Sequence, residues 1–323
     1  MRPELRIEHI NIAPDYSGSE QVRAAVLKAL LYFDIFNYPL TDGEIAGFCS
    51  VKPEGLLQIQ KILKELCDKL IIYRFEDYYT LKNDAGLIGR RKKGNQAAAE
   101  VMDKAGNRSR KIHRFPFVRS VNISGSLSKN YFDEQADLDF FIITAPNRVW
   151  TTRFLLTVYK KIFLLNSRKY FCINYYVDTE ILTIPDKNIF TATEIITLKN
   201  QTGESVYKDF IGANQWVLEM YPNFDPDYTF LQEARDGGLK RMTEKMLSGR
   251  LGNVMESLAF RITALFLRRK YAHLPADAFN INLRAGKHAS KHHPQGFQFR
   301  VLSAFEQKCR EFEAKHAIEL SNG

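Results

Sequence analysis

The chain has 323 residues, of which 45% are hydrophobic and 26% are charged, so it can bury a sizeable core and is too long for one ordinary domain. Its best candidate for a membrane span, residues 258–267, is far shorter than the roughly 18–20 apolar residues required and contains Arg261, so we expect no transmembrane segment. The N-terminal residues show no apolar core followed by a cleavage site, so the expected location is the cytoplasm.

Cysteine content and charge narrow the class of protein further. The 4 cysteines are scattered without a Cys-x-x-Cys pair, which predicts reduced thiols rather than a disulfide framework or a cysteine zinc site. The 46 Lys and Arg against 37 Asp and Glu give a net charge of +9, which suggests an anionic partner such as nucleic acid or a nucleotide phosphate. Where the basic residues lie along the chain decides which anionic partner is favoured.

The first part of the chain predicts three helices. Apolar residues of 21–34 recur at helical spacing, which indicates an amphipathic helix. Thr41 and Glu44 have the spacing of a capping box and begin a short second helix. Pro53 suits the first turn of a third helix, which is expected to run to about Lys69.

Two short β-rich runs around Glu76 and Asp77 follow the third helix, and this order of elements resembles a winged helix-turn-helix domain over residues 1–85. Such a domain either binds duplex DNA or serves as a protein-interaction module. Residues 1–85 hold 10 Lys and Arg against 13 Asp and Glu. DNA binding by this domain is therefore not favoured, because a module that neutralises phosphates should be basic.

Residues 86–114 hold 9 Lys and Arg against 2 Asp and Glu, a net charge of +7. The alanine run at 97–99 favours a helix that links the first domain to the next. A basic run of this kind is either a solvated face or part of an anion-binding surface, and Arg90 to Lys93 are the candidates to frame a bound anion.

The motif that carries chemistry follows. A β-rich run at residues 118–124 leads into Gly125 and Ser126, and a spacer of 10 residues then leads to a strand that opens with Asp137 and Asp139. Because side chains alternate along a strand, the two carboxylates lie on one face, roughly 6–7 Å apart at their Cα atoms. Magnesium takes oxygen ligands, uses one or two protein carboxylates and completes its shell with water and phosphates. The glycine permits close approach of a phosphate, and the serine adds a hydroxyl and an N–H.

This combination resembles the DNA polymerase beta-like nucleotidyltransferase superfamily, whose signature is a Gly-Ser turn, a spacer of about this length and an Asp-x-Asp or Asp-x-Glu strand. The resemblance implies that Gly125 and Ser126 hold the triphosphate of a nucleoside triphosphate, and that Asp137 and Asp139 hold up to two Mg²⁺ ions. The motif covers residues 121–143, and the order of elements extends the resemblance to about Asp178.

A helix is expected after the motif, with a stripe that should pack into the core. The stripe comprises Trp150, Phe154, Val158, Ile162 and Leu165. Residues 169–178 then read as another strand, from which the superfamily usually supplies a third carboxylate. The mid-strand residue is Asn174, which cannot serve as a proton acceptor, and Asp178 lies roughly 13 Å further along the same face. Either Asp178 is the third acid, or Asn174 occupies that place.

The remaining residues predict helices, one of them over 188–198, with no recognisable catalytic motif. A loop with Lys287, His288, Lys291, His292 and His293 offers histidines at a spacing that could share a metal ion. The loop has no nearby carboxylate or cysteine in the sequence, so a surface loop or a phosphate contact by its lysines is favoured over zinc.

The sequence thus predicts an α+β protein in three parts: a winged helix-turn-helix-like domain at 1–85, a linking helix with a small mixed-sheet nucleotidyltransferase core at 86–200, and a helical domain at 201–323. The expected function is transfer of a nucleoside monophosphate to an unidentified hydroxyl acceptor, which could be a small molecule, a protein or RNA. The alternative is a catalytically weak or inactive relative that binds nucleotide or nucleic acid, and a template-free polymerase acting on RNA ends is a third reading.

Overall fold

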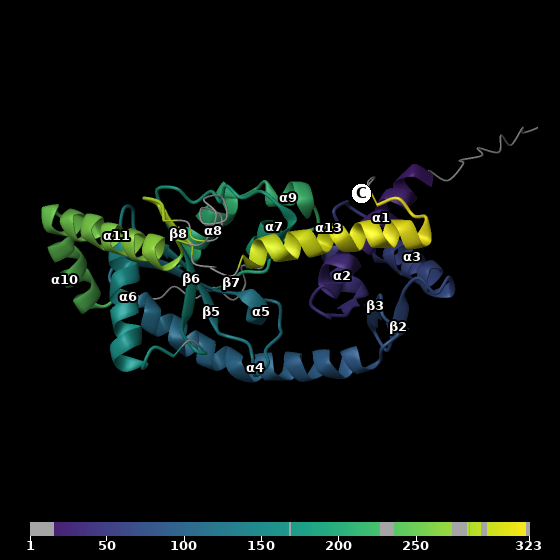
Figure 1. The fold of residues 1–323 in the computed structure, drawn as a ribbon, viewed down its shortest axis with the longest axis horizontal. Helices are drawn as coiled ribbons and strands as arrows, with labels where there is room; N and C mark the ends of the chain where they lie inside the picture. The colour runs from purple at the N-terminus through teal and green to yellow at the C-terminus, as the bar shows by residue number, and fades with distance from the viewer. Residues whose placement is uncertain are drawn as a thin grey trace, which may run out of the picture.

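The computed structural model describes residues 16–167, 169–226, 236–272, 283, 285–291 and 296–320. The protein is an elongated α+β molecule (Figure 1). A small helical body lies at one end and a five-stranded sheet lies at the other, and two long helices, α4 (Gly86–His113) and α13 (Phe297–His316), run between them. The mixed α+β class expected from the sequence is confirmed.

The other helices in the described parts of the chain are α1 (Tyr16–Asp34), α2 (Asp42–Gly47), α3 (Leu56–Asp68), α5 (Gly125–Ser128), α6 (Val149–Phe163), α7 (Ile189–Ile196), α8 (Glu204–Ala213), α9 (Val217–Met220), α10 (Gly238–Leu247) and α11 (Arg250–Lys270). The strands there are β1 (Leu40–Thr41), β2 (Tyr73–Phe75), β3 (Tyr78–Thr80), β4 (Val118–Ser124), β5 (Asp139–Thr144), β6 (Cys172–Asp178), β7 (Lys199–Thr202) and β8 (Ala289–Lys291). None of the described helices is both long enough and apolar enough to cross a membrane.

The N-terminal body follows the sequence pattern closely. The Thr41 side chain caps α2, and the Thr41 backbone N–H donates a hydrogen bond to the Glu44 carboxylate in return, so the predicted capping box is present. The apolar stripe of α3 packs into the core of this body. The helices α1, α2 and α3 are joined by a three-stranded sheet in the order β1-β3-β2, in which β1 is an addition that the sequence pattern did not predict.

The larger sheet has the strand order β7-β4-β5-β6-β8. β4 runs antiparallel to β5, while β5 and β6 run parallel and are connected through α6. Because successive side chains alternate between faces, Phe140 and Ile142 pack with α4 and α6 on one face of the sheet. Phe141 and Ile143 pack with α7, α8 and α9 on the other face.

The C-terminal residues do not form a separate helical domain beyond residue 200. β8 pairs with β6 and becomes an edge of the sheet, and β7 crosses the expected boundary. α13 packs instead against the N-terminal body, where Val301 and Phe312 join the core and Lys308 pairs with Asp34. Short elements such as β8 are stable only when paired, which a reading of local periodicity cannot reveal.

The helix α6 lies in a different orientation from the one its apolar stripe predicted. Trp150 is buried, but Phe154 is 51% exposed, Ile162 is 63% exposed and Leu165 is 89% exposed. The prediction that this stripe packs into the core is therefore wrong for most of its members. The face carrying Arg153 is turned inward instead.

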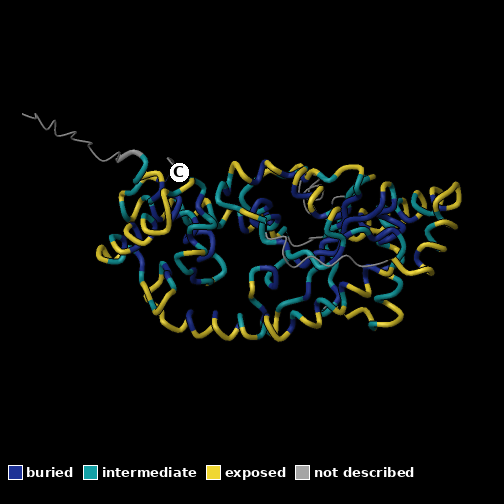
Figure 2. Tube along the Cα trace, turned by 180° about the vertical axis from the view of Figure 1, so that it is seen from behind, coloured by how far each residue is buried: buried dark blue, intermediate teal, exposed yellow. Residues whose placement is uncertain are grey.

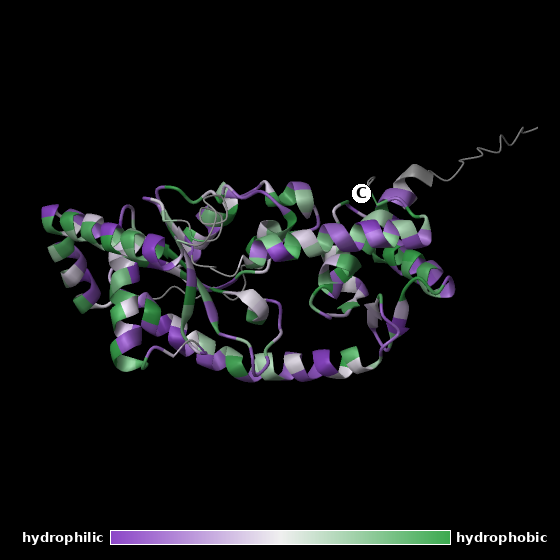
Figure 3. Cartoon of the chain, in the orientation of Figure 1, coloured by the Kyte–Doolittle hydropathy of each residue, from purple (hydrophilic) through white to green (hydrophobic). Residues whose placement is uncertain are grey.

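The long helix α4 connects the two ends of the molecule and has one exposed side along its length (Figure 2). Hydrophilic and hydrophobic residues alternate in bands along both α4 and α13 (Figure 3). On α4 the buried residues include Ala98, Val101 and Ala105, which pack beneath the sheet. The predicted basic linker is thus a single continuous helix with one buried stripe.

Candidate active site

The turn after β4 requires a glycine. Gly125 has a positive φ of 69°, in the left-handed region that disfavours side chains. A Cβ atom at this position would lie 2.6 Å from Oδ2 of Asp139. Ser124 and Asp139 are direct partners in the β4–β5 register, so the sheet holds the Gly-Ser turn against the acidic strand.

Asp137 and Asp139 open onto a cavity of about 670 Å³. Gly125 and Ser126 line this cavity as well, so the tertiary structure brings together the two halves of the motif that the sequence predicted. The walls come from the ends of β4, β5 and β6, from α6 and α7, and from the start of α13. The cavity therefore lies where the sheet meets the helix that reaches the N-terminal body.

Asp139 occupies an unusual electrostatic position. Burial raises the pKa of its carboxyl to about 7, and the nearby carboxylates of Asp137 and Glu194 add to the increase. Cys172 and Lys129 oppose the increase without cancelling it. Near neutral pH this half-buried carboxyl is thus poised between its protonated and ionised forms.

The residue beside Asp139 in the third strand is Asn174. Its Nδ2 donates a hydrogen bond of 2.6 Å to Oδ1 of Asp139. The pairing of β5 with β6 shifts at this point, because Phe140 faces Ile173 whereas Phe141 faces Tyr175. This β-bulge leaves Asn174 without a partner of its own in the ladder and lets its side chain reach Asp139.

Asp178 lies at the far end of the strand pair and does not line the cavity. It is fully buried, and its oxygens accept hydrogen bonds from the backbone N–H groups of Asn147, Glu180 and Ile181. His288 Nδ1 lies 3.0 Å from its Oδ2. The structure thus places Asn174, and not Asp178, next to the acidic pair.

The His288 loop was one candidate for a metal site. Donor atoms of His288, Asp178 and Glu180 lie within 4.8 Å of one another. Asp178 already accepts three backbone hydrogen bonds, and His288 adds a fourth polar contact to its carboxylate. The other histidines of the predicted loop, His292 and His293, lie outside the described residues.

Glu194, Lys129 and Arg153 are site residues that the sequence reading did not single out. Lys129 donates hydrogen bonds to the Gly125 carbonyl oxygen at 3.1 Å and to Glu194 Oε1 at 2.7 Å. Glu194 stands on α7, far from the motif in the sequence, and no local signal marks it. Lys129 follows the Gly-Ser turn by one helical turn, and that spacing was the available signal.

The basic residues divide between two roles. Arg91 pairs with Glu44 through two hydrogen bonds of 2.8 and 2.6 Å, and Lys92 pairs with Glu76. These residues attach α4 to the N-terminal body, and none of residues 90–93 is among those that line the cavity. Of the two lysines predicted to contact phosphate, Lys291 lines the cavity, where it also pairs with Asp186 and Gln298, and Lys287 does not line it.

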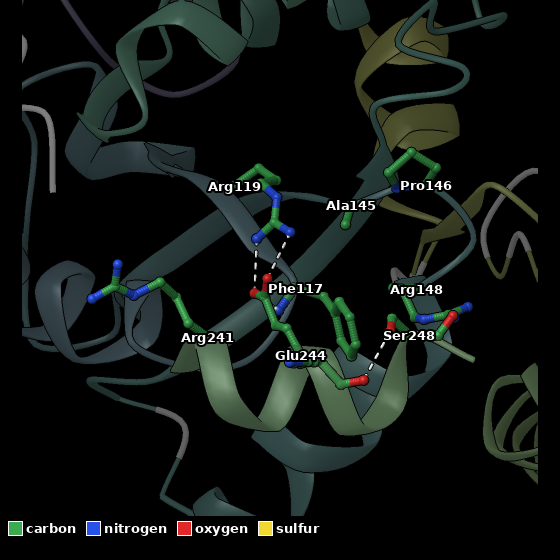
Figure 4. A pocket seen from close by; sticks show the side chains of 9 residues that line it. Phe117, Arg119, Ala145, Pro146, Arg148, Arg241, Glu244 and Ser248 are labelled. Carbon is green, nitrogen blue, oxygen red and sulfur yellow. Dashed lines mark hydrogen bonds and ion pairs between the residues drawn. The ribbon is translucent and has the colours of Figure 1, made fainter. Parts of the chain in front are cut away.

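A second hollow, of about 400 Å³, lies at the opposite end of β4 (Figure 4). Figure 4 shows Glu244 of α10 pointing at Arg119, to which it is bonded at 2.8 and 2.9 Å. Glu244 also accepts the backbone N–H of Phe117. Arg119 and Glu244 neutralise each other, so this hollow is a packing contact between α10 and the sheet.

The acidic cavity suits a divalent cation. Two carboxylates, Asp137 and Asp139, stand at one edge of it, and the pKa of Asp139 is raised mainly by burial and further by the charges of Asp137 and Glu194. A cation would relieve that repulsion and would favour the ionised carboxylate. The place that a Cβ of Gly125 would fill is the approach to these oxygens.

Comparison with known proteins adds no assignment, since no family model, curated protein or solved structure matches the chain.

Proposed function

We propose that the protein is a Mg²⁺-dependent nucleotidyltransferase that transfers a nucleoside monophosphate from a nucleoside triphosphate to a hydroxyl acceptor. The observation that carries this proposal is the Gly125 turn held against Asp139 at the edge of a cavity that Asp137 also lines. A phosphate needs both the open approach and the nearby carboxylates that hold its cation.

The roles of the residues follow from their positions. Asp137 and Asp139 hold Mg²⁺, which would fix the reacting groups and neutralise charge on the transferring and leaving oxygens. Gly125 leaves room for the phosphates, and Ser126 offers its hydroxyl to them. Asn174 orients the Asp139 carboxylate through its Nδ2–H donor but accepts no proton.

In the overall reaction, the acceptor oxygen forms a bond to the α-phosphorus, the bond between that phosphorus and the bridging oxygen breaks, and pyrophosphate leaves. The hydroxyl proton is released to solvent. The cavity has room for both reactants because its walls continue from the acidic edge to α6 and α13.

The direct test is nucleotide binding. We expect Asp137→Ala and Asp139→Ala to lose Mg²⁺-dependent binding of a nucleoside triphosphate by calorimetry. The matched control is Asp209→Ala, which removes an exposed aspartate on α8. Unchanged binding in both site variants would refute the assignment. Incubating the wild type and Asp139→Ala with labelled triphosphates, Mg²⁺ and a cell extract would then identify the acceptor by its label.

A second function, a nucleotide-binding regulator without turnover, is favoured by one observation. Asn174 stands beside Asp139, where a third carboxylate would serve as metal ligand and base. In that case triphosphate binds with Mg²⁺, but no pyrophosphate forms with any acceptor fraction. Detection of Mg²⁺-dependent pyrophosphate release would rule this alternative out.

A further inference from the structure

The helix α6 turns a cationic face toward the cavity. Arg153, Leu156, Thr157 and Lys160 recur at intervals of three and four residues, and all of them line it. On the outer side of the same helix, Phe154 is exposed to solvent. This orientation leaves apolar surface in water and half-buries the Arg153 side chain. Departures from the rule that apolar side chains face inward and charged ones face water are expected mainly at functional or strained sites.

Arg153 has few partners of its own in this position. Its Nη1 donates one hydrogen bond, of 2.8 Å, to Ser290 Oγ. The guanidinium lies near the rings of Trp150 and Tyr176, with centroids at 5.9 and 5.7 Å. No carboxylate among the described residues pairs with it, and burial lowers its pKa. The aromatic rings hold the group in place while most of its N–H donors remain for a ligand.

The two buried arginines of the described residues, Arg91 and Arg148, differ from the half-buried Arg153. Arg91 makes two hydrogen bonds to the Glu44 carboxylate. Arg148 donates to the carbonyl oxygens of Asn147, Leu247 and Ser248 and to Asn253 Oδ1. Buried charges are normally paired in this way, because an uncompensated one is costly. The environment of Arg153 lacks such a partner.

The Arg153 wall is distinct from the acidic edge. Tyr176, which Arg153 contacts, points to the α6 face of the sheet, whereas Asp139 shares its face with Phe141 and α7. Residues of both walls line this one cavity, and among the described residues β8 pairs with β6 at residues 175–177. An anion on Arg153 is therefore a different group from phosphates held at Gly125.

We propose that Arg153, together with Lys160, forms an anion subsite that binds the phosphate or carboxylate group of the acceptor. The acceptor is then an acidic, hydroxyl-bearing small molecule, whose anionic group rests on α6 while its hydroxyl points toward the acidic edge. The assignment of the bound anion to the acceptor rests on the proposed function, but anion binding at Arg153 can be measured separately.

The test uses inorganic phosphate as the probe and the full chain, already saturated with Mg²⁺ and a non-hydrolysable nucleoside triphosphate. We expect saturable phosphate binding that weakens at least 10-fold in Arg153→Met and stays within a few-fold of wild type in Arg153→Lys. The control Lys161→Met removes an exposed cation next to Lys160 and should bind phosphate normally. Thermal melts confirm that each variant is folded, and Arg153→Met should melt no lower than the wild type, because it removes a half-buried charge that pairs with no carboxylate of the described residues.

Two results would overturn the subsite. The first is phosphate binding that is absent, or equal in the wild type and Arg153→Met. The second is phosphate that competes with the nucleotide while Arg153→Met weakens nucleotide binding, which would assign Arg153 to the triphosphate. Failure of the proposed function looks different, since Asp139→Ala would then bind Mg²⁺ and nucleotide normally whatever phosphate does.

Discussion

Asp139 and Asp178 are aspartates at opposite ends of the same parallel strand pair, and their surroundings are opposite in kind. Asp178 accepts three backbone hydrogen bonds and contacts His288. Asp139 receives an amide donor from Asn174 and faces other carboxylates in a cavity. The contrast teaches that burial alone does not mark a functional acid: the fold satisfies the charge of Asp178 and leaves that of Asp139 available to a ligand.

The largest expected effect is on the pH dependence of stability. The folded pKa of Asp139 is about 7, against a usual value of 3.8, so its protonated form is favoured in the folded state. The stability that Asp139 contributes is therefore fully present below about pH 4 and is lost as the pH rises through about 7, by roughly 4 kcal/mol. In metal-free protein, denaturant titrations should show that Asp139→Asn removes this loss. Parallel pH profiles for wild type and variant would contradict it.

The next effect concerns the other end of the strands. Asp178→Ala leaves three backbone N–H groups without their acceptor and should lower the free energy of unfolding by about 3 kcal/mol. Chemical denaturation measures this loss, and Asp139→Ala under the same metal-free conditions should show none. If Asp178→Ala instead abolished Mg²⁺ binding in a fully folded protein, Asp178 would have to be returned to the list of metal ligands.

A smaller effect is expected at the turn. Gly125→Ala forces a side chain into left-handed backbone and against Asp139, and should cost about 2 kcal/mol of stability. It should also weaken nucleotide binding, because the added methyl group occupies the phosphate approach. The control is Gly212→Ala, at a glycine of α8 where an added Cβ meets nothing within 4 Å. Equal behaviour of the two variants would show that the turn tolerates a side chain.

The smallest effect sharpens the role of the bulge. Asn174→Asp adds a third carboxylate next to Asp139 and should tighten Mg²⁺ binding about 10-fold, equivalent to roughly 1.4 kcal/mol. Calorimetric Mg²⁺ titration at pH 8 measures this change. An unchanged affinity would mean that residue 174 does not reach the cation.

Much of the fold and part of the site could be predicted from local sequence. The capping box of Thr41 and Glu44 acts within one helical turn, so its prediction was reliable. The closeness of Gly125 and Asp139 also follows from the sequence, because a short connection between two antiparallel strands places the start of the second strand beside the end of the first. The choice between Asn174 and Asp178 could not be made, because a bulge in strand pairing leaves no periodic signal.

The sequence by itself determined the α+β class, the three helices and the β2–β3 pair of the N-terminal body, and the carboxylate pair, because these depend on residue types at short spacings. Only the tertiary structure decided which way α6 faces, since its apolar stripe predicted burial of Phe154 and the packed protein turns Arg153 inward. It also decided that β8 and α13 complete the cavity from more than 100 residues away. Such contacts are fixed by how the whole chain packs, which the pattern of any one segment does not contain.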